Sequence, residues 1–169
     1  MNRSRTLAEP DRLRQRPHHG RFLIPFVTLV RKGKPDFRVQ DNRRRERCAF
    51  EHLCQLCGEP LDDRIVFCGW APSVERRVFG EPPMHAECCD WAWAVCPFLL
   101  GGDHRPITID DVIALGVWKP KAGPAPRHMA IYTTTDYEPV PCGEGSGSVK
   151  WVAAPPTSIE WRDRLAGAA

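Results

Sequence analysis

The feature that most constrains the fold of this chain is a pair of spaced ligand motifs near its middle. The first is Cys54-x-x-Cys57-Gly58, and the second is His85-x-x-Cys88, with 27 residues between Cys57 and His85. Three thiolates and one imidazole form a ligand set that is typical of structural zinc sites, which are four-coordinate and tetrahedral. The spacing therefore predicts one zinc ion bound by Cys54, Cys57, His85 and Cys88.

The residues around each pair indicate how the four side chains would converge. Two cysteines three positions apart bind one ion when the backbone forms a tight knuckle, and Gly58 supplies the freedom for that turn. Two prolines precede His85, which is typical of a helix start. We expect a helix over 83–95 with His85 and Cys88 on one face of its first turn. A knuckle, a hairpin over 61–80 and this helix make a treble-clef-like plan.

Eight cysteines are many for 169 residues, so other readings of the motifs stay open. Free cysteines are often simply buried, and disulfides would need an oxidising compartment. No signal peptide is visible, and no apolar run approaches the roughly 18 to 20 residues of a membrane helix. A cytoplasmic protein is therefore expected. Cys89 or Cys96 could replace one of the four ligands, whereas a thioredoxin-like redox motif lacks its βαβ setting.

Charge is distributed unevenly along the chain. Residues 1–47 hold 14 Lys/Arg against 5 Asp/Glu, and residues 48–169 hold 10 against 16. Residues 1–20 contain few large apolar groups, so we expect them to form a disordered basic arm. Residues 21–105 are expected to form the zinc-centred domain, and residues 106–169 an αβ extension packed on it. The expected fold class is a small α+β protein.

Hydrophobic patterning and breaker residues predict short elements on both sides of the zinc motifs. The expected strands cover 21–30, 37–40, 64–70, 75–79, 129–134 and 148–153, with a turn over Lys32-Gly33-Lys34-Pro35. The expected helices cover 42–53, 83–95, 109–115 and 158–165, and Asp41 is the expected N-cap of the first. Short elements of this kind are typical of small zinc-organised folds.

Four arginines crowd the start of the helix expected after Asp41. They are Arg43, Arg44, Arg45 and Arg47, and the helix dipole disfavours cations at that end. This placement indicates a nearby anion, either an external one or partner carboxylates such as Asp41 and Glu46. A solvated basic face is the alternative. Contact with nucleic acid would be strongly salt-dependent and read little sequence, since no recognition-helix signature is present.

The chain also resembles a group of uncharacterised proteins common in actinobacteria and their phages. The shared pattern runs Gly-x-Pro-Asp-Phe-Arg, Cys-x-x-Cys-Gly, Pro-Pro-x-His-x-x-Cys-Ala and Cys-Pro-x-Leu, here spread over residues 22–100 and more weakly around 158–161. Cys89 stands where the group carries alanine, which favours Cys88 as the ligand. The resemblance implies the zinc site and a phage or prophage setting in a bacterial host cell, and it implies no activity.

The expected function is that of a non-catalytic, zinc-stabilised interaction protein that binds nucleic acid or a protein. Four protein ligands leave the metal no open position for chemistry. The alternatives are a purely structural phage assembly protein and a metal-dependent nuclease of the ββα-metal type. Such a nuclease needs a general-base histidine on the hairpin, and 61–80 contains none. His104, in a Gly-Gly-Asp-His loop, is the best remaining candidate.

Overall fold

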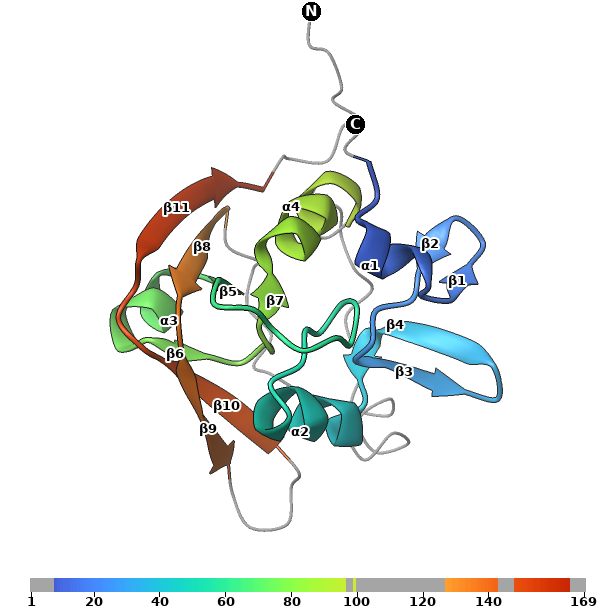
Figure 1. Ribbon diagram of the computed structural model, residues 1–169, viewed down its shortest axis with the longest axis horizontal. Coiled ribbons are helices and arrows are strands. Elements are labelled where there is room, and N and C mark those ends of the chain that lie inside the picture. The colour runs from blue at the N-terminus through green and yellow to red at the C-terminus, as the bar shows by residue number, and fades with distance from the viewer. Residues whose placement is uncertain (1–7, 97–98, 100–126, 143–147, 165–169) are drawn as a thin grey trace, which may run out of the picture.

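Short helices and small antiparallel sheets alternate along the chain in the computed structural model, which describes residues 8–96, 99, 127–142 and 148–164 (Figure 1). The predicted α+β class is confirmed. Along these described parts of the chain, no helix combines the length and the apolar character that crossing a membrane requires. The helix expected over 109–115 falls outside the described residues.

Two hairpins follow a single helical turn near the N-terminus. The turn is α1 (Asp11–Arg14), and the strands are β1 (His18–His19), β2 (Phe22–Leu23), β3 (Thr28–Arg31) and β4 (Lys34–Gln40). β1 pairs with β2 and β3 with β4, both antiparallel. Lys32 and Gly33 have φ values of 47° and 75°, which suits a two-residue turn with left-handed residues at both central positions. The expected turn is therefore present but shorter than predicted, because Lys34 and Pro35 already belong to β4.

The structure differs from the expectation of disorder across the first 20 residues. Residues 8–20 fold onto the rest of the protein, and the side chain of Leu13 is 0 % exposed. Leu13 belongs to the same buried cluster as Cys54, Cys57 and Cys88. Composition marks this segment as too polar to order itself, but one buried leucine and the charge contacts of its neighbours dock it on the central core.

The helix α2 (Asn42–Phe50) begins as expected and ends earlier than expected. The side chain of Asp41 accepts a hydrogen bond from the amide of Arg44 at 3.2 Å, which confirms the predicted N-cap. His52 adopts a φ of 53°, and the amide of Leu53 donates to the carbonyl of Cys48 at 3.3 Å. A left-handed residue with this backward bond is a common helix C-terminus, and it turns the chain into the knuckle.

The hairpin predicted over 61–80 is wrong. The segment forms β5 (Ile65–Gly69), α3 (Ala71–Arg76) and β6 (Val78–Phe79), followed by β7 (Met84–His85) and α4 (Ala86–Val95). β5 and β6 do not pair with each other; β5 lies between β7 and β8, and β6 pairs with β10. A proline in the first turn of α3 favours a helix start there rather than a hairpin turn.

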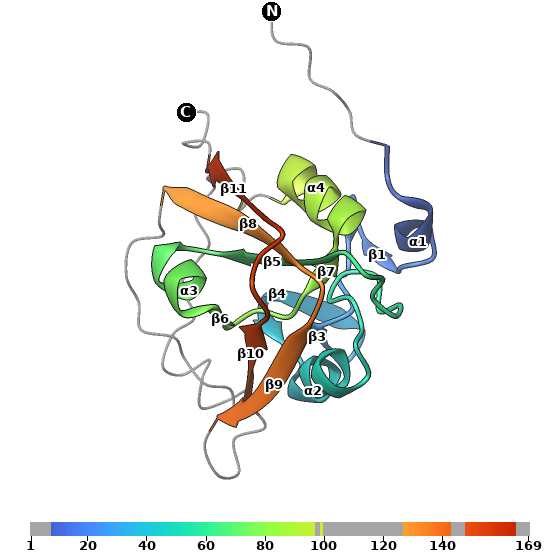
Figure 2. The same cartoon turned by 60° about the vertical axis from the view of Figure 1, so that its left-hand side comes forward.

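The described strands after residue 127 form one long antiparallel ribbon that passes from one sheet into another (Figure 2). Its strands are β8 (His128–Thr134), β9 (Tyr137–Cys142), β10 (Ser148–Ala153) and β11 (Ser158–Asp163). At the bend, the hydroxyl of Tyr132 donates to the carbonyl of Ala154 at 2.7 Å. The hydroxyl of the buried Thr134 donates to the same carbonyl at 3.2 Å and to that of Pro155 at 3.1 Å. These bonds satisfy backbone acceptors where the ladder is interrupted.

The helix predicted over 158–165 is also wrong. Ser158–Asp163 is a strand that pairs with β8 along its whole length, from Ser158 opposite Thr133 to Asp163 opposite His128. Pro155 and Pro156 precede Ser158, and prolines at this position are typical of a helix start. A strand forms here because the neighbouring β8 provides a backbone hydrogen-bonding partner along the whole segment. Local propensity does not contain this information.

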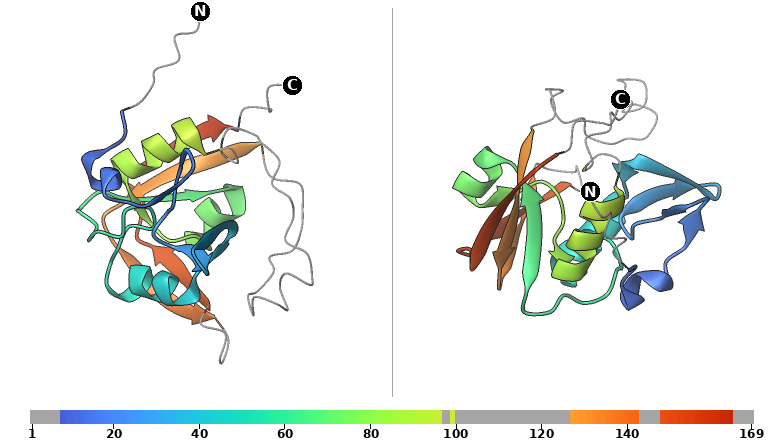
Figure 3. Two further views of the ribbon diagram at one scale, coloured as in Figure 1. Left: turned by 90° about the vertical axis from the view of Figure 1, so that its right-hand side faces the viewer. Right: turned by 90° about the horizontal axis from the view of Figure 1, so that it is seen from above.

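Two hydrophobic cores lie on opposite faces of the four-stranded sheet, whose order is β11-β8-β5-β7. Along β5, Val66 and Cys68 face the cluster that contains α4, while Ile65 and Phe67 face the cluster of the second sheet. This is the two-residue period of a strand that is covered on both sides. Figure 3 shows α4 on one side of β5 and β8, with the sheet β6-β10-β9 beyond them.

Candidate metal centre

The structure brings together the four residues predicted as ligands. Cys54, Cys57, His85 and Cys88 are 0, 6, 1 and 0 % exposed, and their ligand atoms all lie within 4.8 Å of one another. His85 Nδ1 is 3.5 Å from Cys57 Sγ and 4.0 Å from Cys88 Sγ. A buried group of three thiols and one imidazole at these separations could hold a metal ion.

A tight backbone knuckle presents the first pair. The amide of Gly58 donates to the carbonyl of Cys54 at 2.9 Å, and the amide of Cys54 donates to that of Glu59 at 2.9 Å. The amide of Glu59 also points at Cys57 Sγ, at 3.4 Å. A backbone N–H aimed at sulfur stabilises the thiolate, which is the form that binds metal.

Gly58→Ala is expected to destabilise the knuckle by about 2 to 4 kcal/mol. The backbone of Gly58 has a φ of 79°, and a Cβ there would lie 2.6 Å from Phe26 Cδ2. Urea unfolding of the metal-loaded protein measures the loss. Gly20→Ala is the control, because Gly20 has a φ of 61° but nothing within 4 Å of the added Cβ. If both variants lost the same free energy of unfolding, the contact with Phe26 would not be the cause of the destabilisation at Gly58.

The second pair sits at the junction of β7 and α4. His85 is the residue before the helix, with φ −66° and ψ 152°, and Cys88 lies in the first turn. The expectation that both residues are helical is therefore wrong for His85, because α4 begins at Ala86. An extended His85 still faces Cys88, since the chain turns into the helix between them.

Gln55 connects the two ligand pairs, and the motif analysis missed it. Its amide donates to the carbonyl of Pro83 at 3.0 Å, and its side-chain Nε2 donates to the carbonyl of Pro82. The knuckle is thus fixed directly to the segment that leads into His85. The only signal in the sequence was a polar residue between two cysteines, which does not by itself indicate a buried bond.

The orientation of the imidazole leaves one nitrogen for a metal. His85 Nε2 lies 2.9 Å from the carbonyl oxygen of Pro60, while Nδ1 faces Cys57 and Cys88. The carbonyl can only accept, so the proton is assigned to Nε2 and the lone pair to Nδ1. Metal-binding histidines usually donate their second N–H in this way, which fixes the ring.

Arg12 places a positive charge at the edge of the cluster. Its Nη1 lies 2.8 Å from His85 Nε2. A guanidinium nitrogen can only donate, so with the proton on Nε2 this is a close approach of two donors and not a hydrogen bond. Its guanidinium also pairs with Glu87 and, at 3.4 Å, with Glu59. Burial lowers the pKa of Arg12, but Glu87 and the thiols of the cluster raise it by more. This role could not be predicted from the sequence, because Arg12 lies in the segment expected to be disordered.

Negative charge is favoured at Cys54 over Cys88. Burial raises the pKa of Cys54, but hydrogen bonds from Cys57 and Cys88 and from backbone amides lower it well below its usual range. The pKa of Cys88 is raised because its thiol donates to Cys54 and Cys57. The cluster therefore stabilises an anion, and a bound cation would draw the remaining protons off.

Three of the four arginines proposed to bind nucleic acid make hydrogen bonds or ion pairs with other residues of this chain. Arg44 Nη1 donates to the carbonyl of Phe26 at 2.8 Å, and Arg47 pairs with Glu51 at 2.8 Å. Arg43 is exposed. The expectation of partner carboxylates is met for Arg47 by Glu51 rather than by Asp41 or Glu46.

Arg45 is the most enclosed of the four. Its Nη2 donates to the carbonyls of Gly80 at 2.7 Å and Val149 at 3.0 Å, and its guanidinium lies 4.9 Å from the ring centre of Trp151. The side chain therefore ties α2 to β10. Nucleic-acid contact by the four arginines stays a prediction, and Arg43 is the member whose side chain is most open to it.

The alternative ligands and the other histidines lie outside the four-residue group. Cys89 contacts Cys68 rather than the cluster, at an Sγ–Sγ distance of 3.5 Å, and Cys96 is the C-cap of α4. His52 stacks on Tyr137 with ring centres 4.7 Å apart, and the exposed His128 pairs with Asp163. His104 lies outside the described residues. Within the described parts of the chain, His85 is the one histidine in the cluster.

The chain matches no protein-family model, no curated protein and no solved structure. Its function is therefore inferred from the geometry and chemistry of its own residues.

Proposed function

We propose that this chain is a non-catalytic interaction protein whose fold is stabilised by one zinc ion, in the phage or prophage setting that its motifs imply. The observation that supports this is the burial of all four donors, Cys54, Cys57, His85 and Cys88. Catalytic zinc sites keep one position for water or substrate, whereas structural sites are closed by four protein ligands. A closed, buried set favours a structural role.

The donor chemistry and spacing support zinc as the ion. Zinc bonds of about 2.3 Å to sulfur and 2.0 Å to nitrogen place tetrahedral ligands about 3.6 Å apart for S···N pairs. The two separations from His85 Nδ1, 3.5 and 4.0 Å, lie close to that value. Soft thiolates also select zinc over magnesium or calcium, which prefer oxygen.

We further propose nucleic acid as the partner, bound at the β3–β4 hairpin. Arg31, Lys32 and Lys34 are exposed around the tip of this hairpin, and Phe37 on β4 is 45 % exposed. Phe37 meets the exposed Phe22 edge-on at 6.2 Å between ring centres. Cations beside exposed aromatic rings are typical of surfaces that bind single strands, because phosphates meet the charges and bases stack on the rings.

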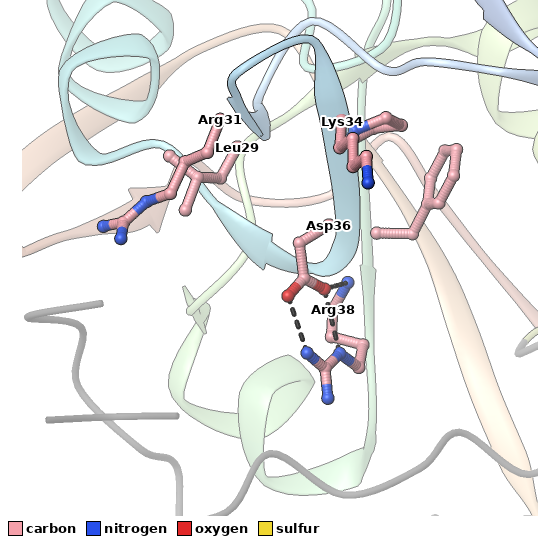
Figure 4. Close-up of a pocket in the computed structure, with 7 residues that line it drawn as sticks. Leu29, Arg31, Lys34, Asp36 and Arg38 are labelled. Carbon is pink, nitrogen blue, oxygen red and sulfur yellow. Dashed lines mark hydrogen bonds and ion pairs between the residues drawn. The ribbon is translucent and has the colours of Figure 1, made fainter. Parts of the chain in front are cut away.

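The hairpin also carries an open pocket beside these cations (Figure 4). Arg31 and Lys34 lie on opposite sides of it, and Asp36 pairs with Arg38 at 2.7 Å between them. The Asp36–Arg38 pair neutralises the one carboxylate among the pocket residues, so the pocket keeps a positive balance. This balance supports a polyanion rather than a cationic partner.

Binding to a fluorescent single-stranded oligonucleotide should weaken steeply with salt. Replacing Lys32 and Lys34 together with Gln should lower the salt slope by about 1.4, since each phosphate contact contributes about 0.7 for single strands. Phe37→Ala should weaken binding by about 1 to 3 kcal/mol through lost stacking. Fluorescence anisotropy from 50 to 300 mM salt, about the range over which such contacts are screened, measures both.

Arg43→Ala tests the competing surface in the same experiment, because Arg43 is an exposed arginine on α2 and one of the four predicted contacts. If only Arg43→Ala weakens binding, the contact surface is α2 and the hairpin proposal is wrong. Salt-insensitive binding, or none, would exclude nucleic acid and favour a protein partner found by co-purification.

A further inference from the structure

We propose that Cys68 and Cys89 form a thiol oxidation site, separate from the metal donors, at which a peroxide produces a reversible disulfide. Their Sγ atoms lie 3.5 Å apart. A disulfide needs about 2.05 Å between sulfurs, so the two Sγ atoms would have to approach each other by about 1.5 Å. No function considered above uses either residue.

The fold directs these two thiols toward each other and away from the ion site. Cys68 alternates with Phe67 on β5 and faces the core that contains α4. Cys89 follows the donor Cys88 by one residue in α4, which turns it about 100° around the helix. Cys88 therefore faces the donor cluster, while Cys89 faces β5.

The surroundings of the two thiols indicate which of them is oxidised first. Cys68 is partly exposed, whereas Cys89 is 1 % exposed. We take Cys68, the less buried residue of the two, as the thiol that is oxidised first, and Cys89 as the resolving thiol. The hydrogen bond with Cys89 and the charge of Arg162 lower the pKa of Cys68 against the effect of burial, which favours its thiolate. Arg162 is held in place by Asp90, at 2.9 Å.

The chemistry balances with hydrogen peroxide as the oxidant. The sulfur of Cys68 attacks one peroxide oxygen, the O–O bond breaks, and one water leaves with a sulfenic acid on Cys68. The sulfur of Cys89 then attacks the sulfenic sulfur, the S–S bond forms, and the hydroxyl leaves as a second water. Two thiols are oxidised by two electrons, and one peroxide is reduced to two waters.

Other cysteines differ from this pair in their surroundings. The four-residue metal cluster uses Cys54, Cys57 and Cys88. Cys48 is fully buried, and burial raises its pKa to about 12, which disfavours its thiolate. These thiols should outlast Cys68 and Cys89 at low peroxide.

The test is mass spectrometry of the full chain, as purified in the presence of zinc, after one equivalent of hydrogen peroxide. Remaining thiols are alkylated in denaturant with chelator, the chain is digested with trypsin, and linked peptides are fragmented. We expect one link, between Cys68 and Cys89, a loss of two thiols, reversal by dithiothreitol and an unchanged zinc content. Metal analysis and circular dichroism before oxidation verify that each variant is folded.

Cys68→Ser and Cys89→Ser should each abolish the link, and Cys142→Ser should keep it. Cys89→Ala serves as a second variant if the serine is not tolerated at this buried position. A link from Cys68 to Cys88 or Cys96, or zinc release before thiol loss, would overturn the proposal. Survival of both the Cys68 and the Cys89 thiol after peroxide treatment would also overturn it.

Discussion

Cys57→Ser is expected to lose the bound zinc and to unfold. Structural zinc contributes about 10 to 16 kcal/mol of apparent binding free energy at neutral pH, while whole domains are stable by only about 5 to 15 kcal/mol. Removing one of four buried donors leaves three that cannot close the tetrahedron, and Cys57 also anchors the knuckle through the amide of Glu59. Elemental analysis and far-ultraviolet circular dichroism measure the two losses.

Cys142→Ser is the matched control, because Cys142 is partly exposed at the end of β9. This variant should keep one zinc per chain and its circular dichroism. A Cys57→Ser protein that lost zinc but kept its fold would show that the ion is not structural. A wild-type chain purified without zinc would remove the basis of the proposal.

Acid should reproduce the effect of the substitution on the wild-type protein. The donors must be deprotonated to bind, so zinc binding releases protons and a fall in pH weakens it. We therefore expect zinc release and unfolding together as pH falls, and at neutral pH an excess of chelator should do the same.

Trp151→Ala is expected to cost about 3 to 5 kcal/mol of unfolding free energy without loss of zinc. Trp151 is 0 % exposed, lies opposite Phe79 across the β10–β6 pair, and carries Arg45 over its ring. It belongs to the core of the second sheet, whereas the metal donors belong to the other core. Urea unfolding at saturating zinc measures the cost, and metal analysis of the folded variant measures the stoichiometry.

Trp151→Phe tests whether the large loss expected for Trp151→Ala comes from removing the aromatic ring, because phenylalanine keeps a ring in the core. The indole Nε1 of Trp151 has no hydrogen-bond partner among the described residues, so losing it removes a buried donor while keeping an aromatic ring. We expect a loss of about 1 kcal/mol or less. If the Trp151→Ala variant unfolded at the same urea concentration as the wild type, packing around Trp151 would not contribute to the stability of the protein.

The metal cluster could be predicted because its information is local and chemically specific. Cys54 and Cys57 are three positions apart, as are His85 and Cys88, and few side chains other than cysteine and histidine make such a ligand set. The N-cap at Asp41 could be predicted for the same reason, since a cap is defined by residues within one helical turn.

Pairing between distant segments could not be predicted in this way. β6 finds its partner in β10, and Ser158–Asp163 becomes a strand because β8 lies beside it. Local propensity favoured a hairpin in the first case and a helix in the second. The prediction of disorder around Leu13 failed for a related reason. A single apolar residue in a polar segment gives no periodic signal, so its burial could not be predicted.

The position of β5 between β7 and β8 has a consequence for the order of assembly. The four metal donors and β7 lie within one stretch of the chain, and β8 to β11 form a ribbon whose strands are neighbours in sequence. Joining the two requires β5 to pair with β8 across a long intervening segment. Because such non-local pairing slows folding, we expect two local units to form first and their docking along β5 to be the slow step.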